Sequence, residues 1–296
     1  MSLGSFRAPS LPARAPRVRA LAKWQQRAHP PPNQPWGGGM AKLDVNATRD
    51  PDFRFFIWMS GICLVIAFGG FIPTYWLQLA RGTFVGPPLL HIHGALFFAW
   101  TFLLLSQATL AAKGQLRWHR AWGLLGISLA TAIVIVGTAT AINSLQNGLA
   151  AGYGDHSRSF VVIPLSAISM FAGFFIAAIA NTRRPEAHKR LMLLATISLL
   201  GAAMARVFIL LMVGSGPGMR PGIGPPPPMF VALVPSLLLE LLIVAGMVYD
   251  WRTRGRPHPA WLVGFAVMTA VVVFRAPLSS TPAWLGFADF LAHLGG

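Results

Sequence analysis

The chain has 296 residues, of which 54% are hydrophobic and only 11% charged, and its mean hydropathy is +0.58. Soluble domains usually carry about 25% charged residues, so the composition indicates a membrane protein. The net charge of +16 is spread over the ends of apolar runs, which favours a lipid bilayer as partner and argues against nucleic acid. Cys63 is the single cysteine, which excludes internal disulfides and thiolate metal clusters.

The first 50 residues are predicted to be a disordered, basic N-terminal extension. Residues 1–39 hold six Arg or Lys, no acidic residue and a Pro-rich stretch around Pro31, a composition that does not form a packed core. An acid-poor, Arg-rich leader also suits an organelle transit peptide. A third interpretation is that translation begins at Met40, since codons for Gly37, Gly38 and Gly39 would resemble a bacterial ribosome-binding site.

Apolar segments of the length needed to cross a bilayer, about 18 residues or more, follow one another from Asp52 onward. We predict an all-α membrane helical bundle over residues 51–280, with a short C-terminal tail over 281–296. About seven membrane spans are expected, at 53–78, 88–112, 119–142, 159–181, 188–213, 229–250 and 259–278.

Basic residues are concentrated in alternate connections, which predicts the orientation of the bundle. Connections 113–118, 182–187 and 251–258 together carry seven Lys or Arg, whereas the other connections carry one each. The positive-inside rule then places the N-terminus in the cytoplasm and the C-terminus outside, in a bacterial cytoplasmic (inner) membrane. Several tryptophans near the span ends suit an aromatic belt: Trp58, Trp76, Trp118, Trp251 and Trp261.

Polar side chains inside the predicted spans are candidate functional residues, because a charge at the bilayer centre costs roughly 2.5–3.5 kcal/mol on insertion scales. They are His91, His93, Gln107, His119, His188, Arg206, Glu240 and Arg275.

Helical spacing sorts these residues into faces. His188 and Arg206 are separated by 18 residues, five whole turns of a straight helix, and are therefore predicted to share a face. The face of His119 continues through the small residues Gly123, Gly126 and Gly137. Such a strip either lets helices pack closely or leaves room for a flat cofactor.

The remaining candidates allow competing interpretations. His93 shares a face with Gln107, but His91 is rotated by about 200° in a helix, so the two histidines bind one metal only if residues 91–93 are extended. Glu240 lies among leucines and needs protonation or a partner. Arg206 is the expected partner, in a structural ion pair; alternatively, the carboxylate relays protons or binds a substrate.

Two motifs carry a resemblance to other proteins. The first is His91-x-His-Gly with Trp100, Gln107, Gly114 and His119-Arg-x-x-Gly, and the second is Arg184-Pro-Glu-Ala-His-Lys-Arg-Leu-Met. Together they resemble a broad group of bacterial polytopic membrane proteins of unknown function over roughly residues 53–260. The resemblance implies a polytopic fold and supplies no activity.

The two motifs also resemble each other, since each opens a span with histidine beside basic residues and runs into Ile-Ser-Leu. This predicts a weak parallel repeat and a four-helix core, an arrangement in which paired histidines can hold haem b. Ligation needs two histidines at one depth. His119 with His188 on the inside satisfies this, as does, less well, His91 or His93 with His156 outside. Alternatively, the inner histidines anchor the helix ends or bind anionic lipid headgroups.

Three function classes remain open from the sequence. The leading hypothesis is a membrane redox protein that binds haem b or quinone through His93, His119, His188 or His91. A proton-coupled or small-solute transporter using Arg206, Glu240 and His93 is the second. The third is a non-catalytic subunit or assembly factor with membrane-complex partners, or a homo-oligomer. The sequence argues against a retinal protein, because the seventh span has no lysine for a Schiff base.

Overall fold

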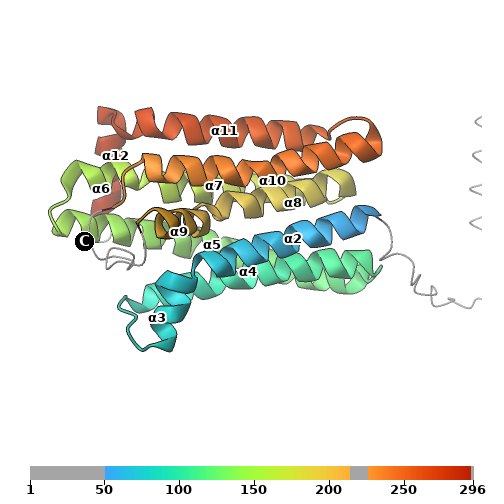
Figure 1. Cartoon of the computed structure of the whole chain (residues 1–296), viewed down its shortest axis with the longest axis horizontal. Coiled ribbons are helices and arrows are strands. Elements are labelled where there is room, and N and C mark those ends of the chain that lie inside the picture. Colours follow the sequence, from blue (N-terminus) through green and yellow to red (C-terminus); the bar gives the residue numbers. More distant parts are fainter. Residues whose placement is uncertain (1–50, 214–225, 295–296) are drawn as a thin grey trace, which may run out of the picture. The chain divides into compact units, whose positions relative to one another are not determined.

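The computed structural model describes residues 51–213 and 226–294. The predictions for residues 1–50 and for most of the Gly/Pro connection 214–228 fall outside these ranges. Within them, the chain is built of helices joined by short connections, as an all-α fold requires (Figure 1).

The helices follow the predicted order. The chain forms α2 (Pro51–Gly70), the π-helical turn η2 (Ile72–Trp76), α3 (Leu77–Ala80), α4 (Pro88–Ala112), α5 (Leu116–Ala150), α6 (Gly154–Phe160), α7 (Val162–Ala180), α8 (Pro185–Leu199), α9 (Gly201–Val213), α10 (Phe230–Arg254), α11 (Pro259–Ser279) and α12 (Pro282–His293). In the described part of the chain, six helices are long and apolar enough to cross a membrane, and the bent pair α8–α9 makes up to seven. The protein is therefore a polytopic membrane protein.

The long helix α5 extends beyond its predicted end at residue 142. Its 35 residues span about 52 Å, well over the roughly 30 Å of a bilayer core. The prediction stopped where Asn143 and Gln146 interrupt the apolar run. The helix continues because these side chains have partners: the Gln146 amide donates to the Ala292 carbonyl at 2.8 Å, and Asn143 accepts from Asn147 at 3.2 Å.

The predicted straight helix over 188–213 is wrong. The chain bends by 44° between α8 and α9, next to Ser198 and Gly201, a residue combination often found at helix kinks. Since the bend interrupts the 3.6-residue repeat, the five-turn spacing no longer places His188 and Arg206 on one face.

The first span is also broken, at its crossing with α9. A Cβ added to Gly70 would lie 2.3 Å from the carbonyl oxygen of Ala203, so only glycine allows the two backbones to approach this closely. The helix ends at Gly70 and the chain continues through η2 and α3.

The basic connections meet at one end of the bundle, which we call the basic end; the other is the opposite end. Lys189 of α8 contacts Asp52 at the start of α2, and Arg254 at the end of α10 contacts Glu186 at 2.5 Å. These contacts place the start of α2 with two basic connections, as the positive-inside rule requires. Which side of the membrane the basic end faces stays a prediction.

The core confirms the packing role of Cys63, which is fully buried. Trp100 is also buried, and its indole Nε1 donates to the Thr196 hydroxyl at 3.0 Å. The aromatic-belt prediction is wrong for Trp261, which is fully buried beneath Gly246, where an added Cβ would lie 2.5 Å from its ring.

The segment expected to be a tail contains α12, which packs on α5 and α6. Arg158 of α6 contacts Asp289 at 2.6 Å, and the Trp284 indole donates to the Arg158 carbonyl at 2.8 Å. These contacts hold α12 against the opposite end of the bundle.

Candidate functional site

Two histidines occupy equivalent positions at the basic end. His119 is the fourth residue of α5 and His188 the fourth residue of α8, and each of these helices follows a tight connection from the preceding helix, α4 or α7. The two imidazole rings lie 6.4 Å apart between centroids, with planes inclined at 79°. The structure thus brings together His119 and His188, the pair that the sequence predicted on the inner side. Both side chains are half-buried at the start of their helices.

Hydrogen bonds to backbone carbonyls define the tautomer of both rings. His119 Nδ1 is 3.3 Å from the carbonyl oxygen of Gln107 on α4, and His188 Nδ1 is 2.9 Å from that of Ala178 on α7. A carbonyl oxygen only accepts, so in each neutral ring the hydrogen sits on Nδ1 and the lone pair on Nε2. This is the usual arrangement of a metal-ligating histidine, whose second nitrogen donates to a carbonyl or carboxylate.

The face of α5 that carries His119 is loosely packed near the histidine and closely packed deeper in the bundle. An added Cβ at Gly126 would lie 3.2 Å from Leu103, and one at Gly137 would lie 3.0 Å from Ile168, whereas at Gly123 nothing lies within 4 Å. Close packing therefore explains the glycines deeper in the bundle, and open space remains one turn from His119. The side-chain Nε2 of Gln107 is buried with no hydrogen-bond partner among the described residues, which leaves an unused donor beside the pair.

His91 and His93 do not form a joint metal site. Helix α4 begins at Pro88, so residues 91–93 are helical and the two rings point in different directions. His91 Nδ1 shares a hydrogen bond of 2.9 Å with the Tyr75 hydroxyl. His93 stacks on Phe97 with centroids 4.1 Å apart.

The alternative outer pair is not formed either. His156 Nε2 lies 2.5 Å from the carbonyl oxygen of Pro226 and donates to it. His91 is engaged with Tyr75, and no contact joins the ring of His156 to His91 or His93 in the described structure. The inner pair is therefore the one that can share a ligand.

The predicted ion pair between Arg206 and Glu240 is wrong. Arg206 donates to the Ala202 carbonyl at 2.9 Å and lies over the Phe71 ring, 4.4 Å from its centroid. Glu240 of α10 accepts from the Thr269 hydroxyl of α11 at 2.6 Å. Arg206 and Glu240 thus face different neighbours, whereas Arg206 lies close enough to His93 for its charge to act on that ring.

Sequence reasoning missed a buried ion pair near His188. Arg190 is fully buried and bidentate to Asp250: Nε donates at 2.8 Å to Oδ2, and Nη2 donates to Oδ1. Arg190 Nη1 also donates to a Glu186 carboxylate oxygen at 2.7 Å, and the His258 backbone N–H donates to Asp250 at 3.1 Å. The pair ties α8 to α10 beside the candidate site.

Further ion pairs extend this cluster to α2. Lys189 contacts Asp52 and, at 2.9 Å, Glu186, and Arg254 contacts Asp52 at 3.1 Å. Only eight Asp or Glu occur in the chain, and three of them meet here. Acidic residues next to basic connections in so acid-poor a sequence were the available signal, but the basic residues were interpreted as determinants of topology alone.

His258 lies outside the membrane-spanning helices and is the N-cap residue of α11, where its Nδ1 accepts from the Ala260 N–H at 3.1 Å. Burial lowers the pKa of His258 below its ordinary value, and the nearby positive charge of Arg190 lowers this pKa further. The neutral ring is therefore the form that caps the helix.

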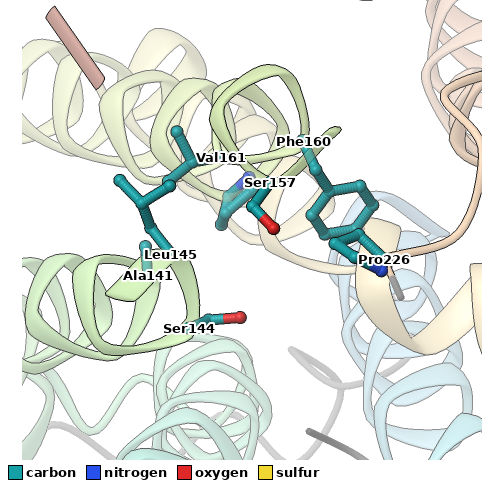
Figure 2. Close-up of a pocket in the computed structure, with 8 residues that line it drawn as sticks. Ala141, Ser144, Leu145, Ser157, Phe160, Val161 and Pro226 are labelled. Atoms are coloured by element: carbon teal, nitrogen blue, oxygen red, sulfur yellow. The ribbon is translucent and has the colours of Figure 1, made fainter. Parts of the chain in front are cut away.

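The described residues offer no larger metal-binding cluster beside the histidine pair. No cluster of three or more His, Cys, Asp or Glu could hold a metal ion in the described ranges. Figure 2 shows a cavity at the opposite end, where the hydroxyl groups of Ser144 and Ser157 point into the space. Its volume of about 20 Å³ suits a single water molecule.

No protein-family model, curated protein or solved structure matches the chain. The resemblance carried by the two motifs therefore stays a prediction. The fold class rests on the helices themselves, which define a polytopic membrane protein.

Proposed function

We propose that the protein is a membrane redox protein that holds haem b between His119 and His188. The observation that carries the proposal is the ring separation of 6.4 Å, with both Nδ1 atoms bonded to carbonyls. Because each Nδ1–H is bonded to a carbonyl, the Nε2 lone pairs of both rings would be available to hold a haem iron.

The number of ligands favours haem over a bare metal ion. Protein zinc sites take three or four side chains, and the described residues offer no group of that size. Haem iron needs only axial ligands from the protein, and the pair supplies two. Quinone is less well supported, because its two carbonyls need donors, whereas both Nε2 atoms carry lone pairs and the unused Gln107 Nε2 could serve one carbonyl only.

Different residues of the chain would bind the iron, orient the two imidazole rings and contact the propionate groups. His119 and His188 would donate their Nε2 lone pairs, while the carbonyls of Gln107 and Ala178 hold the rings in orientation. Gly123 leaves the face of α5 loosely packed one turn from His119, and Arg120, exposed beside His119, offers positive charge for propionate groups. Bound haem b supplies one-electron oxidation and reduction.

An optical spectrum of the full-length protein tests the proposal. Protein purified in mild detergent from a haem-sufficient host should show a Soret band and a reduced-minus-oxidised difference spectrum. We expect His119→Ala and His188→Ala each to remove the low-spin spectrum, because either change leaves one axial ligand. His156→Ala is the matched control, since this ring lies outside the pair, and it should leave the spectrum unchanged.

Two outcomes would contradict the proposal. One is purified protein without a Soret band even after incubation with hemin. The other is a haem spectrum that persists in both the His119 and His188 variants, since bound haem would then rest on other residues. A thermal melt of each variant separates loss of ligation from loss of folding.

A further inference from the structure

A second cavity lies between α10 and α11, near the opposite end of the bundle. Its volume is about 230 Å³, and its lining is apolar except for one arginine: Met229, Leu233, Val272, Val273, Arg275 and Ala276. The proposed haem site does not involve it, since His119 and His188 lie at the basic end.

Arg275 brings a positive charge into this apolar lining. The residue is only 6% exposed, and its Nη2 donates to the Ala232 carbonyl at 2.8 Å and to the Ser236 hydroxyl at 3.0 Å. Its Nε and Nη1 have no partner in the described part of the chain, and no described carboxylate forms an ion pair with it. The guanidinium thus lines the cavity with donors still free and its charge uncompensated.

The chain offers no other acid for this arginine among the described residues, because each described carboxylate is bound elsewhere. Three lie at the basic end, two contact Arg158, and one accepts from Thr269: Asp52, Glu186, Asp250, Asp155, Asp289 and Glu240. Glu240 keeps its Oε1 without a hydrogen-bond partner among the described residues, but it forms no ion pair with Arg275. A buried charge without a counterion is costly. An anion that enters the cavity would relieve that cost.

The position of the cavity indicates where its ligand comes from. Leu233, Val273 and Ala276 are exposed on membrane-spanning helices, so the cavity opens toward lipid. Arg275 lies four residues before the end of α11 at Ser279, about 6 Å along the helix. Arg275 therefore lies near one end of the span, where a headgroup is closer than at the bilayer centre.

We propose that the cavity between α10 and α11 binds an amphipathic anion from the bilayer, with its carboxylate or phosphate on Arg275 and its acyl chain along Leu233 and Val273. The apolar walls suit the chain, and the free guanidinium donors suit an anionic oxygen. Fatty acids and anionic phospholipids share this chemistry.

Titration of the delipidated full chain with defined probes tests this inference. The probes are oleate, methyl oleate, which has the same chain without the charge, and dioleoylphosphatidylglycerol, with bound probe counted by native mass spectrometry. We expect oleate or the phospholipid to bind the wild-type protein more tightly than methyl oleate. Arg275→Gln should weaken that binding about ten- to hundredfold, and Arg275→Lys should retain most of it.

Two further variants separate the charge from the cavity and from folding. Ala276→Phe fills the cavity without touching the charge and should abolish specific binding. Arg206→Gln removes another intramembrane arginine, which does not line the cavity, and should leave binding unchanged. If Arg275→Gln does not fold, the binding measured for Ala276→Phe and Arg275→Lys tests the proposed site instead.

The inference is overturned if methyl oleate binds as tightly as both anions, or if folded Arg275→Gln or Ala276→Phe retains wild-type affinity. A preference for oleate identifies the headgroup as a carboxylate and a preference for phosphatidylglycerol as a phosphate; both support the site. The haem spectrum is measured separately and depends on residues at the other end of the bundle, so the two proposals fail independently.

Discussion

Replacement of Asp250 by asparagine should strongly destabilise the bundle. Asp250 is fully buried and accepts three hydrogen bonds, two from the Arg190 guanidinium and one from the His258 N–H. Asparagine keeps the shape and one acceptor oxygen, but it leaves the buried guanidinium without its full counterion. Since removing one partner of a buried pair costs about 3–5 kcal/mol, we expect a loss of that size in unfolding free energy.

Asp289→Asn provides a chemically matched control at the opposite end. The Asp289 side chain is 45% exposed and its partner Arg158 is 26% exposed, and exposed pairs contribute no more than about 1 kcal/mol. Unfolding free energies of both variants would be measured by titration with sodium dodecyl sulfate in mixed micelles, followed by far-UV circular dichroism.

A loss below about 1 kcal/mol for Asp250→Asn, or a loss equal to that of Asp289→Asn, would refute the reasoning. A paired replacement, Arg190→Met with Asp250→Leu, sharpens the test. Apolar substitution of both partners avoids an orphaned charge and is often close to neutral, so the double variant should be more stable than Asp250→Asn alone.

Three further predictions concern packing, pH and coupling. Gly246→Ala should cost about 1–3 kcal/mol in a thermal or detergent melt because a Cβ would meet an indole ring at 2.5 Å, whereas Gly173→Ala, with open space around it, should not destabilise. Because the folded state lowers the pKa of His258, the unfolded chain binds the proton more readily. The stabilisation that the neutral His258 ring contributes is therefore complete above about pH 6.5 and is lost as the pH falls. His258→Asn should make the unfolding free energy depend less on pH in this range. Arg206→Gln and Glu240→Gln should be additive within about 0.5 kcal/mol in a double-mutant cycle, since they share no partner; a larger coupling would restore the predicted ion pair.

The sequence predicted the position of a helix correctly where the length of its apolar segment alone sets its two ends. The span at 88–112 matches α4 at both ends, and the all-α fold follows from the apolar runs. The errors fall where tertiary contacts extend or break a helix. Polar residues after position 142 join α5 because α12 supplies a partner for Gln146, and no pattern within α5 contains that information.

The candidate site could be predicted only in part. Histidine beside basic residues at the start of two spans is visible in the sequence, and depth alone paired His119 with His188. Their separation and their Nδ1 hydrogen bonds depend on how α4 and α7 present their carbonyls, which no local pattern encodes. The uncompensated charge of Arg275 likewise emerged only once the partners of the described acids were known.

The sequence by itself determined that this is a polytopic, all-helical membrane protein, because each span must satisfy its own backbone hydrogen bonds in lipid and must be apolar along its length. The tertiary structure alone decided which polar side chains meet. Arg206 lies over Phe71 while Glu240 accepts from Thr269, and packing of two helix hairpins set His119 and His188 6.4 Å apart. Side-chain partners depend on the rotation and bending of helices against one another, and these are set by contacts between segments far apart in the chain.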